Sequence, residues 1–273
     1  MPIITIYRGA FTAGEEIAKG VGQALGYRCV SRDALIEASR SYGISEAKLN
    51  EVIDKDPHWW ERWLENLRPY RVVLQAAMCT VAEGGNLVYH GHIGHELFPG
   101  IRHVLKVMLT APTEFRIHQV QAQQGLDEAK ARRYIDQVDD ARSRRLVALF
   151  GNDWRDITRY DLALNVAQLG VEGAIRVIVE AARLERYQLT PGSEENFRNL
   201  ALVSRVEAAL VASPKFRNLE ISVRAQKGEV QLSGVFAHSV SEDEIVKLAK
   251  SVPGVTRVVT DITVLPVDLS DRY

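Results

Sequence analysis

Hydrophobic and polar positions follow two alternating patterns along the first two thirds of the chain. Short apolar runs predict buried strands at residues 3–6, 87–90, 104–109 and 162–166. Between them, apolar residues recur every third or fourth position. One such helix carries Ile17, Val21 and Leu25 and ends at Gly26, and others are predicted at 32–41, 57–82 with a break at Pro69, 113–123, 127–149 and 171–187. Strands that alternate with helices predict an α/β fold with one parallel sheet flanked by helices.

The last seventy residues show a different order of patterns. A helical apolar face containing Leu202 and Val206 comes first. Two strands follow, joined by a turn at residues 226–228, and Ser241 begins a second helix with a capping box. Residues 255–265 form the last predicted strand. The order helix, strand, strand, helix, strand predicts a small α+β unit.

A polar stretch containing Pro191, Gly192 and Ser193 separates these two regions. Proline and glycine often end helices, and polar residues bury little apolar surface, so the stretch is typical of a linker. We therefore predict a first domain at residues 1–187, a linker at 188–198, a second domain at 199–267 and a tail at 268–273.

Composition narrows the class of protein. The 273 residues are 46% hydrophobic and 25% charged, values typical of globular chains and not of disordered ones. The formal net charge of −1 gives no indication of a nucleic-acid partner. No apolar run reaches the ~20 residues that span a bilayer, and the N-terminus lacks a signal-peptide pattern. With two cysteines, Cys29 and Cys79, expected to be reduced and buried, the sequence predicts a cytoplasmic protein without a transmembrane segment.

The loop at residues 7–14 connects the first strand to the first helix. A glycine-bearing loop that leads into a helix can hold a phosphate on backbone N–H groups. The Walker pattern GxxxxGK[ST] is not met, because Glu15 and Glu16 stand where it requires lysine and serine or threonine. Taken alone, the loop is more typical of an ordinary strand-to-helix turn.

Histidines and arginines supply the remaining candidate chemistry. His90, His92 and His95 lie close together, but a zinc site needs a fuller ligand set, so a polar loop is the more ordinary interpretation and no metal site is predicted. Arg142 and Arg145 share a helix face, and arginine suits phosphate oxygens. Because acidic residues are interleaved on that helix, a simple solvated face is the more ordinary interpretation.

Several segments, in order, resemble the cytidylate kinase-like family of P-loop phosphotransferases. They are the opening Ile3-Ile-Thr-Ile-x-Arg8, Gly14-x-Glu16-Ile17-Ala18, Ser31-Arg-Asp33-Ala-Leu35-Ile36, Ala111-Pro112-x-x-Phe115-Arg116-Ile117, Asp139-x-x-Arg142 and Phe150-Gly-x-Asp-Trp154. The resemblance covers the first ~185 residues and implies a P-loop kinase-like sheet. Two departures concern the chemistry. The family's Gly-Ser-Gly-Gly loop reads Phe11-Thr12-Ala13-Gly14 here, and His92 stands where the family shows an arginine.

The resemblance implies an ATP- and Mg²⁺-dependent kinase of a nucleoside monophosphate or a similar small phosphorylated acceptor. Donor phosphates would be held by Arg8, Phe11, Thr12, Ala13, Gly14 and Glu15. The transferring charge would be stabilised by Arg116, Arg142 and Arg145, and His92 would face the acceptor, with its protonation favoured near neutral pH by the bound phosphate. The alternative is a weakly active or inactive protein that binds or senses a nucleotide.

Residues 199–266 resemble a BON domain. The matching stretches are Val230-x-Leu232-x-Gly234-Val235 and Val252-Pro-Gly254-Val255-x-x-Val258. The resemblance implies a domain that engages phospholipid or a protein partner, and in this chain it would regulate or localise the kinase-like domain.

Overall fold

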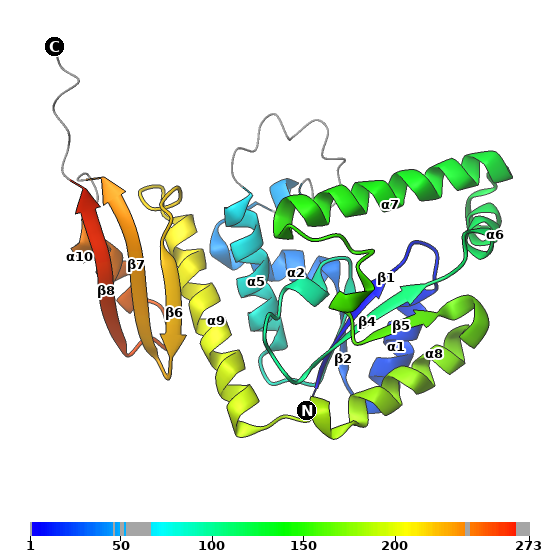
Figure 1. The fold of residues 1–273 in the computed structure, drawn as a ribbon, viewed down its shortest axis with the longest axis horizontal. Helices are drawn as coiled ribbons and strands as arrows, with labels where there is room; N and C mark the ends of the chain where they lie inside the picture. Colours follow the sequence, from blue (N-terminus) through cyan, green and yellow to red (C-terminus); the bar gives the residue numbers. More distant parts are fainter. Residues whose placement is uncertain (1, 46, 50–51, 53–66, 238–240, 266–273) are drawn as a thin grey trace, which may run out of the picture.

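The computed structural model describes residues 2–45, 47–49, 52, 67–237 and 241–265. Its larger sheet has five parallel strands in the order β2-β3-β1-β4-β5 (Figure 1). The strands are β1 (Ile3–Arg8), β2 (Arg28–Ser31), β3 (Leu87–Gly91), β4 (Val104–Thr110) and β5 (Leu162–Asn165). The predicted parallel sheet flanked by helices is confirmed.

Helices pack on both faces of this sheet because the buried strands carry apolar side chains on both faces. Ile4 and Ile6 pack with α1 (Gly14–Leu25) and α8 (Val166–Arg183). Ile3 and Tyr7 lie in the opposite core with α2 (Arg32–Ser39), α5 (Arg68–Ala82) and the end of α7 (Glu128–Phe150). Helix α6 (Thr113–Gln124) packs on the start of α7 in a small separate cluster, and short 3₁₀ turns lie at Arg40–Tyr42, Gly94–Glu96, Ile157–Arg159 and Glu185–Tyr187.

The four predicted strands are present, and the sequence pattern missed β2. That strand has four residues, lies at the edge of the sheet and is partly exposed, so it has no continuous apolar run. The helix predicted at 171–187 begins earlier, at Val166, and is interrupted at Gly170, whose φ is 66°. Of the helix predicted at 57–82, only the part from residue 67 falls among the described residues.

The C-terminal unit has the predicted order of elements. They are α9 (Pro191–Ala212), β6 (Ser222–Gln226), β7 (Glu229–Ala237), α10 (Glu242–Lys250) and β8 (Arg257–Leu265). Strand β7 pairs antiparallel with β6 and parallel with β8. The core of this C-terminal unit contains Val206, Val230, Leu232 and Ile245, all fully buried.

The stretch predicted as a linker is largely helical, which corrects that prediction. Helix α9 begins at Pro191, because Thr190 and Ser193 form a reciprocal capping box. Proline fits the first helical position, where its missing N–H is not needed. The proline and the polar residues therefore start a helix here and do not interrupt one.

Helix α9 stands between the two sheets and packs on both sides (Figure 1). Leu202, Val206 and Leu210 enter the core of the small unit, whereas Ala208 and Val211 pack against α5. Arg68 of α5 adds two hydrogen bonds across the junction, from Nη1 to the Leu219 carbonyl at 2.6 Å and from Nη2 to the Ile221 carbonyl at 3.1 Å. The two units thus share one helix.

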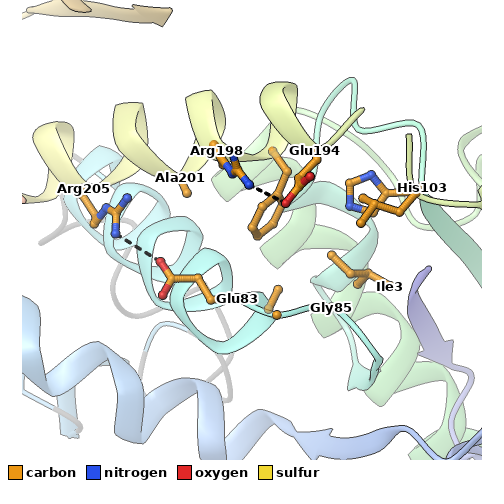
Figure 2. Close-up of a pocket in the computed structure, with 12 residues that line it drawn as sticks. Ile3, Glu83, Gly85, His103, Glu194, Arg198, Ala201 and Arg205 are labelled. Atoms are coloured by element: carbon orange, nitrogen blue, oxygen red, sulfur yellow. Dashed lines mark hydrogen bonds and ion pairs between the residues drawn. The ribbon is translucent and has the colours of Figure 1, made fainter. Parts of the chain in front are cut away.

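A cavity of about 320 Å³ remains at this junction, beside the amino end of the large sheet (Figure 2). Two ion pairs line it, Arg205–Glu83 at 3.1 Å and Arg198–Glu194 at 2.6 Å, together with His103. Each cation is matched by a carboxylate, so the cavity has no strong preference for an anion or a cation.

Among the described residues, no helix is long and apolar enough to cross a membrane. Cys79 is buried as expected, but Cys29 is exposed. It lies in the edge strand β2, so the prediction of two buried thiols is wrong for this residue.

Candidate functional site

The loop between β1 and α1 adopts a conformation that normally favours glycine. Phe11 has a φ of 61° and Ala13 a φ of 52°, both in the left-handed region. For a residue with a Cβ this region costs about 1 kcal/mol or more. Position 9 requires glycine for another reason: a Cβ there would lie 2.7 Å from the Leu109 carbonyl oxygen of β4. The loop thus keeps a tight, strained backbone path although two positions carry side chains.

Three successive carbonyls of this loop are hydrogen-bonded to side chains. The Arg8 carbonyl accepts from Arg142 Nη1 at 3.0 Å, the Gly9 carbonyl from Thr12 Oγ1 at 2.9 Å, and the Ala10 carbonyl from Arg116 Nε at 3.0 Å. In contrast, the backbone N–H groups of residues 10–16 have no hydrogen-bond acceptor within the described part of the chain. The loop and first turn of α1 therefore present a run of free donors.

A cavity of about 630 Å³ lies against this loop. Arg8, Lys19 and Arg142 line it, together with Glu15, which pairs with Lys19 at 2.8 Å and with Arg8 at 3.7 Å. The Lys19 ammonium lowers the pKa of the Glu15 carboxyl, chiefly through their hydrogen bond. The repulsion that Glu15 alone would exert on an anion is thus offset by two neighbouring cations.

Arg116 supports the loop from behind. It is 9% exposed and forms a bidentate pair with Asp139 of α7, with both N–O distances at 2.8 Å. Because its Nε also donates to the Ala10 carbonyl, one guanidinium joins α6, α7 and the loop. The contacts of Arg116 in the described chain are thus with Ala10 and Asp139. No sequence pattern assigned Asp139 a role in holding Arg116.

His92 is buried in a cationic environment at the carboxyl end of β3. Burial lowers its pKa well below the usual value, and Arg142, Arg8, Arg145 and Arg32 lower it further. Burial and the neighbouring cations thus both favour the neutral imidazole over the protonated one. Arg145, at 4% exposed, belongs to the same group of cations. The fold thus brings together arginines from β1, α2 and α7 around one histidine.

Tyr7 lies at the centre of an aromatic cluster beside His92. Its ring stacks on Trp154 with 5.2 Å between centroids and meets His92 and His95 edge to face, at 6.0 and 5.6 Å. Burial raises the pKa of the Tyr7 hydroxyl, and the nearby Arg142 opposes that shift. This cluster fills the face of the sheet that Ile3 and Tyr7 face, next to β1.

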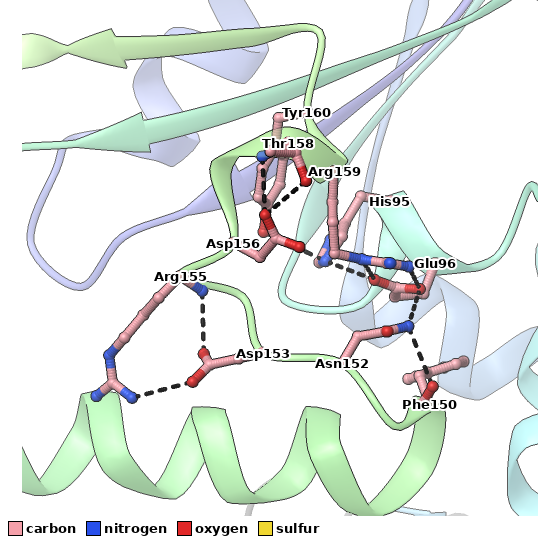
Figure 3. Close-up of polar contacts among 10 residues, drawn as sticks. All are labelled: His95, Glu96, Phe150, Asn152, Asp153, Arg155, Asp156, Thr158, Arg159 and Tyr160. Atoms are coloured by element: carbon pink, nitrogen blue, oxygen red, sulfur yellow. Dashed lines mark hydrogen bonds and ion pairs between the residues drawn. The ribbon is translucent and has the colours of Figure 1, made fainter.

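The histidine loop (residues 92–97) is held by a buried polar network (Figure 3). Glu96 accepts from Arg159 Nε at 2.7 Å and from Asn152 Nδ2 at 3.2 Å. His95 Nε2 lies 3.2 Å from the Tyr160 hydroxyl, and burial lowers the His95 pKa to about 4. No group of three or more histidine, cysteine or acidic side chains suited to a metal ion occurs among the described residues.

The site residues singled out in the sequence fall into two groups. Arg8, Phe11, Thr12, Ala13, Gly14, Glu15 and Arg142 surround or form the loop cavity. His92 lies near Arg142 and Arg145, and Arg116 hydrogen-bonds the loop at the Ala10 carbonyl. Lys19 was missed, although its position one turn after Glu15 on a helix offered the signal. Tyr7 was missed as well, and Asp139 was named only within a motif, without a role as partner of Arg116.

Comparisons with known proteins agree with both sequence resemblances. Residues 3–168 match the model of the cytidylate kinase-like family, and residues 200–266 match that of the BON domain. A cytidylate kinase from Ignicoccus hospitalis is 28% identical over 179 residues, which are 65% of this chain and 97% of that protein. A cytidylate kinase from Desulfurococcus amylolyticus is 28% identical over 162 residues, which are 59% and 82% of the two chains.

A solved structure of an uncharacterised protein from Eubacterium ventriosum is similar to the N-terminal region. It aligns with a TM-score of 0.53 at 16% identity and covers 66% of this chain and 97% of its own. At this identity the likeness shows the fold alone.

Proposed function

This chain belongs to the cytidylate kinase-like family, and from that premise we propose that it is an ATP-dependent phosphotransferase. Its acceptor would be a nucleoside monophosphate or a similar small phosphorylated molecule. The observation that carries the proposal is the run of free N–H groups at residues 10–16, beside loop carbonyls that side chains already bind. Such a run, at a helix N-terminus, suits the phosphates of a nucleotide donor.

The donor side would be formed by the β1–α1 loop and its cations. Backbone N–H groups of Phe11, Thr12, Ala13, Gly14 and Glu15 would contact the phosphate oxygens. Arg8 and Lys19, which line the same cavity, would offset the phosphate charge. Mg²⁺ bound with the nucleotide would supply further charge neutralisation. Glu15 and Glu16 at the helix start would repel the nucleotide phosphates. The ion pair with Lys19 reduces this repulsion for Glu15.

The acceptor side would be formed by His92 and the arginines around it. A neutral imidazole can donate one hydrogen bond to an acceptor phosphate. Arg142 and Arg145 would stabilise the charge on the transferring phosphoryl group, since catalysis of this reaction rests on positioning and electrostatics. Arg116, predicted as catalytic, would act by holding the loop through its contacts with Ala10 and Asp139.

Calorimetric titration with ATP, with and without Mg²⁺, and a coupled assay with CMP as acceptor test this proposal. We expect a dissociation constant no tighter than about 10 μM, or roughly −7 kcal/mol, because strained residues replace glycines in the loop. Arg142→Gln should lower kcat/KM by 100-fold or more. The matched control is Arg133→Gln, an exposed residue on the same helix, and it should leave the rate unchanged.

A second outcome would favour the alternative function. If ATP binds but no nucleoside monophosphate is phosphorylated, the chain is a nucleotide-binding protein without turnover. The strained Phe11 and Ala13 are the observation that supports this alternative, because both differ from the glycines of the family loop. Absence of ATP binding would contradict both functions.

For the C-terminal unit we propose a localising role through binding of phospholipid, in a cytoplasmic protein of two functional units, residues 1–187 and 199–267. Val235 on β7 supports this because it is a large apolar side chain with 60% exposure. Sedimentation of the full chain with phospholipid vesicles tests it, and Val235→Asp should reduce the bound fraction. If vesicles bind neither the unaltered chain nor Val235→Asp, a protein partner becomes the better explanation for this surface.

A further inference from the structure

A second basic pocket lies far from the β1–α1 loop. It has a volume of about 430 Å³ and opens beside the first residues of β4 and the segment before β5. In the strand register, Val104 pairs with Ile3 and Leu109 pairs with Arg8. Lys106, which also lines the pocket, pairs with Thr5, so three to five strand residues separate the pocket from the loop, or about 10 to 17 Å. An occupant of this pocket would not contact the donor loop.

Four cationic side chains line this basic pocket: Arg102, Lys106, Arg159 and Arg186. Its one acidic residue, Asp161, already accepts a hydrogen bond from the Lys106 backbone N–H at 2.8 Å. Within the described ranges of the chain, Arg102, Lys106 and Arg186 form no ion pair. The pocket therefore concentrates positive charge in a chain whose net charge is −1.

Two of these cations are fixed in place by the fold. Glu96, with a side chain only 5% exposed, binds Arg159 through both carboxylate oxygens (Figure 3). Arg102 donates from Nε to the Arg186 carbonyl at 3.2 Å. Partial burial lowers the pKa of the Lys106 ammonium, so its charge is held at a cost that an anion would reduce. The positions of Arg102 and Arg159 are thus set before any ligand binds.

Buried side chains form the floor of the pocket. Phe98, Ile101 and Tyr160 are each less than 10% exposed and line it below the cations. A ligand with a charged group and a small uncharged body would match this arrangement. Guanidinium and ammonium groups make their strongest hydrogen bonds to phosphate and carboxylate oxygens. A phosphate, with a charge of about −1.5 to −2 at pH 7, matches several cations better than one carboxylate does.

We propose that this basic pocket binds a small phosphate-bearing molecule as a ligand separate from both substrates of the proposed reaction. Arg102, Lys106 and Arg186 would contact the phosphate, and the apolar floor would contact the body of the ligand. The pocket adjoins Arg159, whose partner Glu96 belongs to the histidine loop. A bound ligand would therefore be linked to the histidine loop through the Arg159–Glu96 pair and would be placed to act as an effector.

Protection of Lys106 from acetylation, measured by peptide mass spectrometry on the full chain, tests the proposal. The probes are ribose 5-phosphate and inorganic pyrophosphate, with ribose as the uncharged control. We expect saturating ribose 5-phosphate to slow Lys106 acetylation at least fivefold. Lys19 reports separately on the donor cavity, so failure here is distinguishable from failure of the proposed kinase function.

A double variant and a matched control complete the experiment. Arg102→Gln with Arg186→Gln should raise the concentration for half-protection at least tenfold. Arg176→Gln with Arg183→Gln removes the same charge from exposed pairs on α8 and should leave protection intact. Unchanged Lys106 acetylation at 10 mM of either phosphate, or equal protection in both double variants, would overturn the proposal. Protection only by phosphatidylglycerol vesicles would also overturn it and would assign the pocket to a membrane surface.

Discussion

The β1–α1 loop and the histidine loop follow neighbouring strands of one sheet, yet they are stabilised in different ways. The first is held by hydrogen bonds to its backbone carbonyls, and the N–H groups of residues 10–16 have no acceptor among the described residues. The second is held through its side chains, by Glu96, His95 and the aromatic cluster around Tyr7. The path of the first loop is held at its backbone, so Phe11 and Ala13 can stand in left-handed positions, whereas the second loop is held through the side chains of Glu96 and His95.

The largest expected effect comes from breaking the network under the histidine loop. Arg159→Met leaves the Glu96 carboxylate buried without its cation, which should cost about 3–4 kcal/mol of unfolding free energy. Arg155→Met is the control, because its pairs with Asp140 and Asp153 are exposed and worth at most about 1 kcal/mol. Urea denaturation measures both. Equal losses would mean that the histidine loop does not depend on its buried ion pair.

Stability should also fall in acid because of the same loop. The His95 pKa is about 4 in the folded chain, below the usual 6.5, so the unfolded chain binds more protons between these values. The stabilising contribution is complete above pH 6.5 and is lost as pH falls toward 4, by roughly 3 kcal/mol at 1.4 kcal/mol per pKa unit. His90, with a pKa also lowered to about 4 by burial, acts in the same direction.

His95→Gln sharpens this expectation, since the amide can still meet the Tyr160 hydroxyl but does not titrate. Unfolding free energies of this variant should depend less on pH between 6.5 and 4 than those of the unaltered chain. His118→Gln on the exposed face of α6 is the matched control and should keep the original slope. A slope unaffected by His95→Gln would remove this residue from the acid response.

The β1–α1 loop should respond in binding more than in stability. Arg116→Lys keeps a cation near Asp139 but loses the bidentate geometry and the hydrogen bond to the Ala10 carbonyl. We expect ATP affinity to fall about tenfold, or about 1.4 kcal/mol, in a calorimetric titration. Arg132→Lys, which changes an exposed pair with Glu128, should bind ATP as before. Unaltered affinity in Arg116→Lys would show that the loop keeps its path without this support.

The fold could be predicted from the sequence wherever one local pattern decided the structure. Continuous apolar runs predicted the central strands. They did not predict β2, because an edge strand is only half buried. Helix α9 was misjudged at its start because Pro191 and Ser193 are equally typical of a linker and of a helix N-terminus. The apolar side chains of α9 that pack against α5, Ala208 and Val211, could be explained only once the position of α5 was known.

The candidate site was predictable in its residues but not in their roles. Arg116 was recognised by its motif, yet its contacts depend on Asp139, which is 23 positions later in the chain. The sequence predicts that a bound phosphate would favour protonation of His92. Its lowered pKa follows from burial and from arginines on three different elements, which no local pattern places together. Roles that depend on contacts between distant segments can be assigned only from the three-dimensional structure.

The smallest expected effect tests whether the loop's strain is real. Ala13 has a φ of 52° and is exposed, so Ala13→Gly removes a left-handed penalty of about 1 kcal/mol without deleting a contact. The greater freedom of glycine in the unfolded chain offsets part of this gain, which leaves a net stabilisation of about 0.5 kcal/mol. Ala129→Gly in the exposed first turn of α7 is the matched control and should destabilise by a similar amount. Opposite signs in thermal unfolding would support a strained loop, and destabilisation by both substitutions would contradict it.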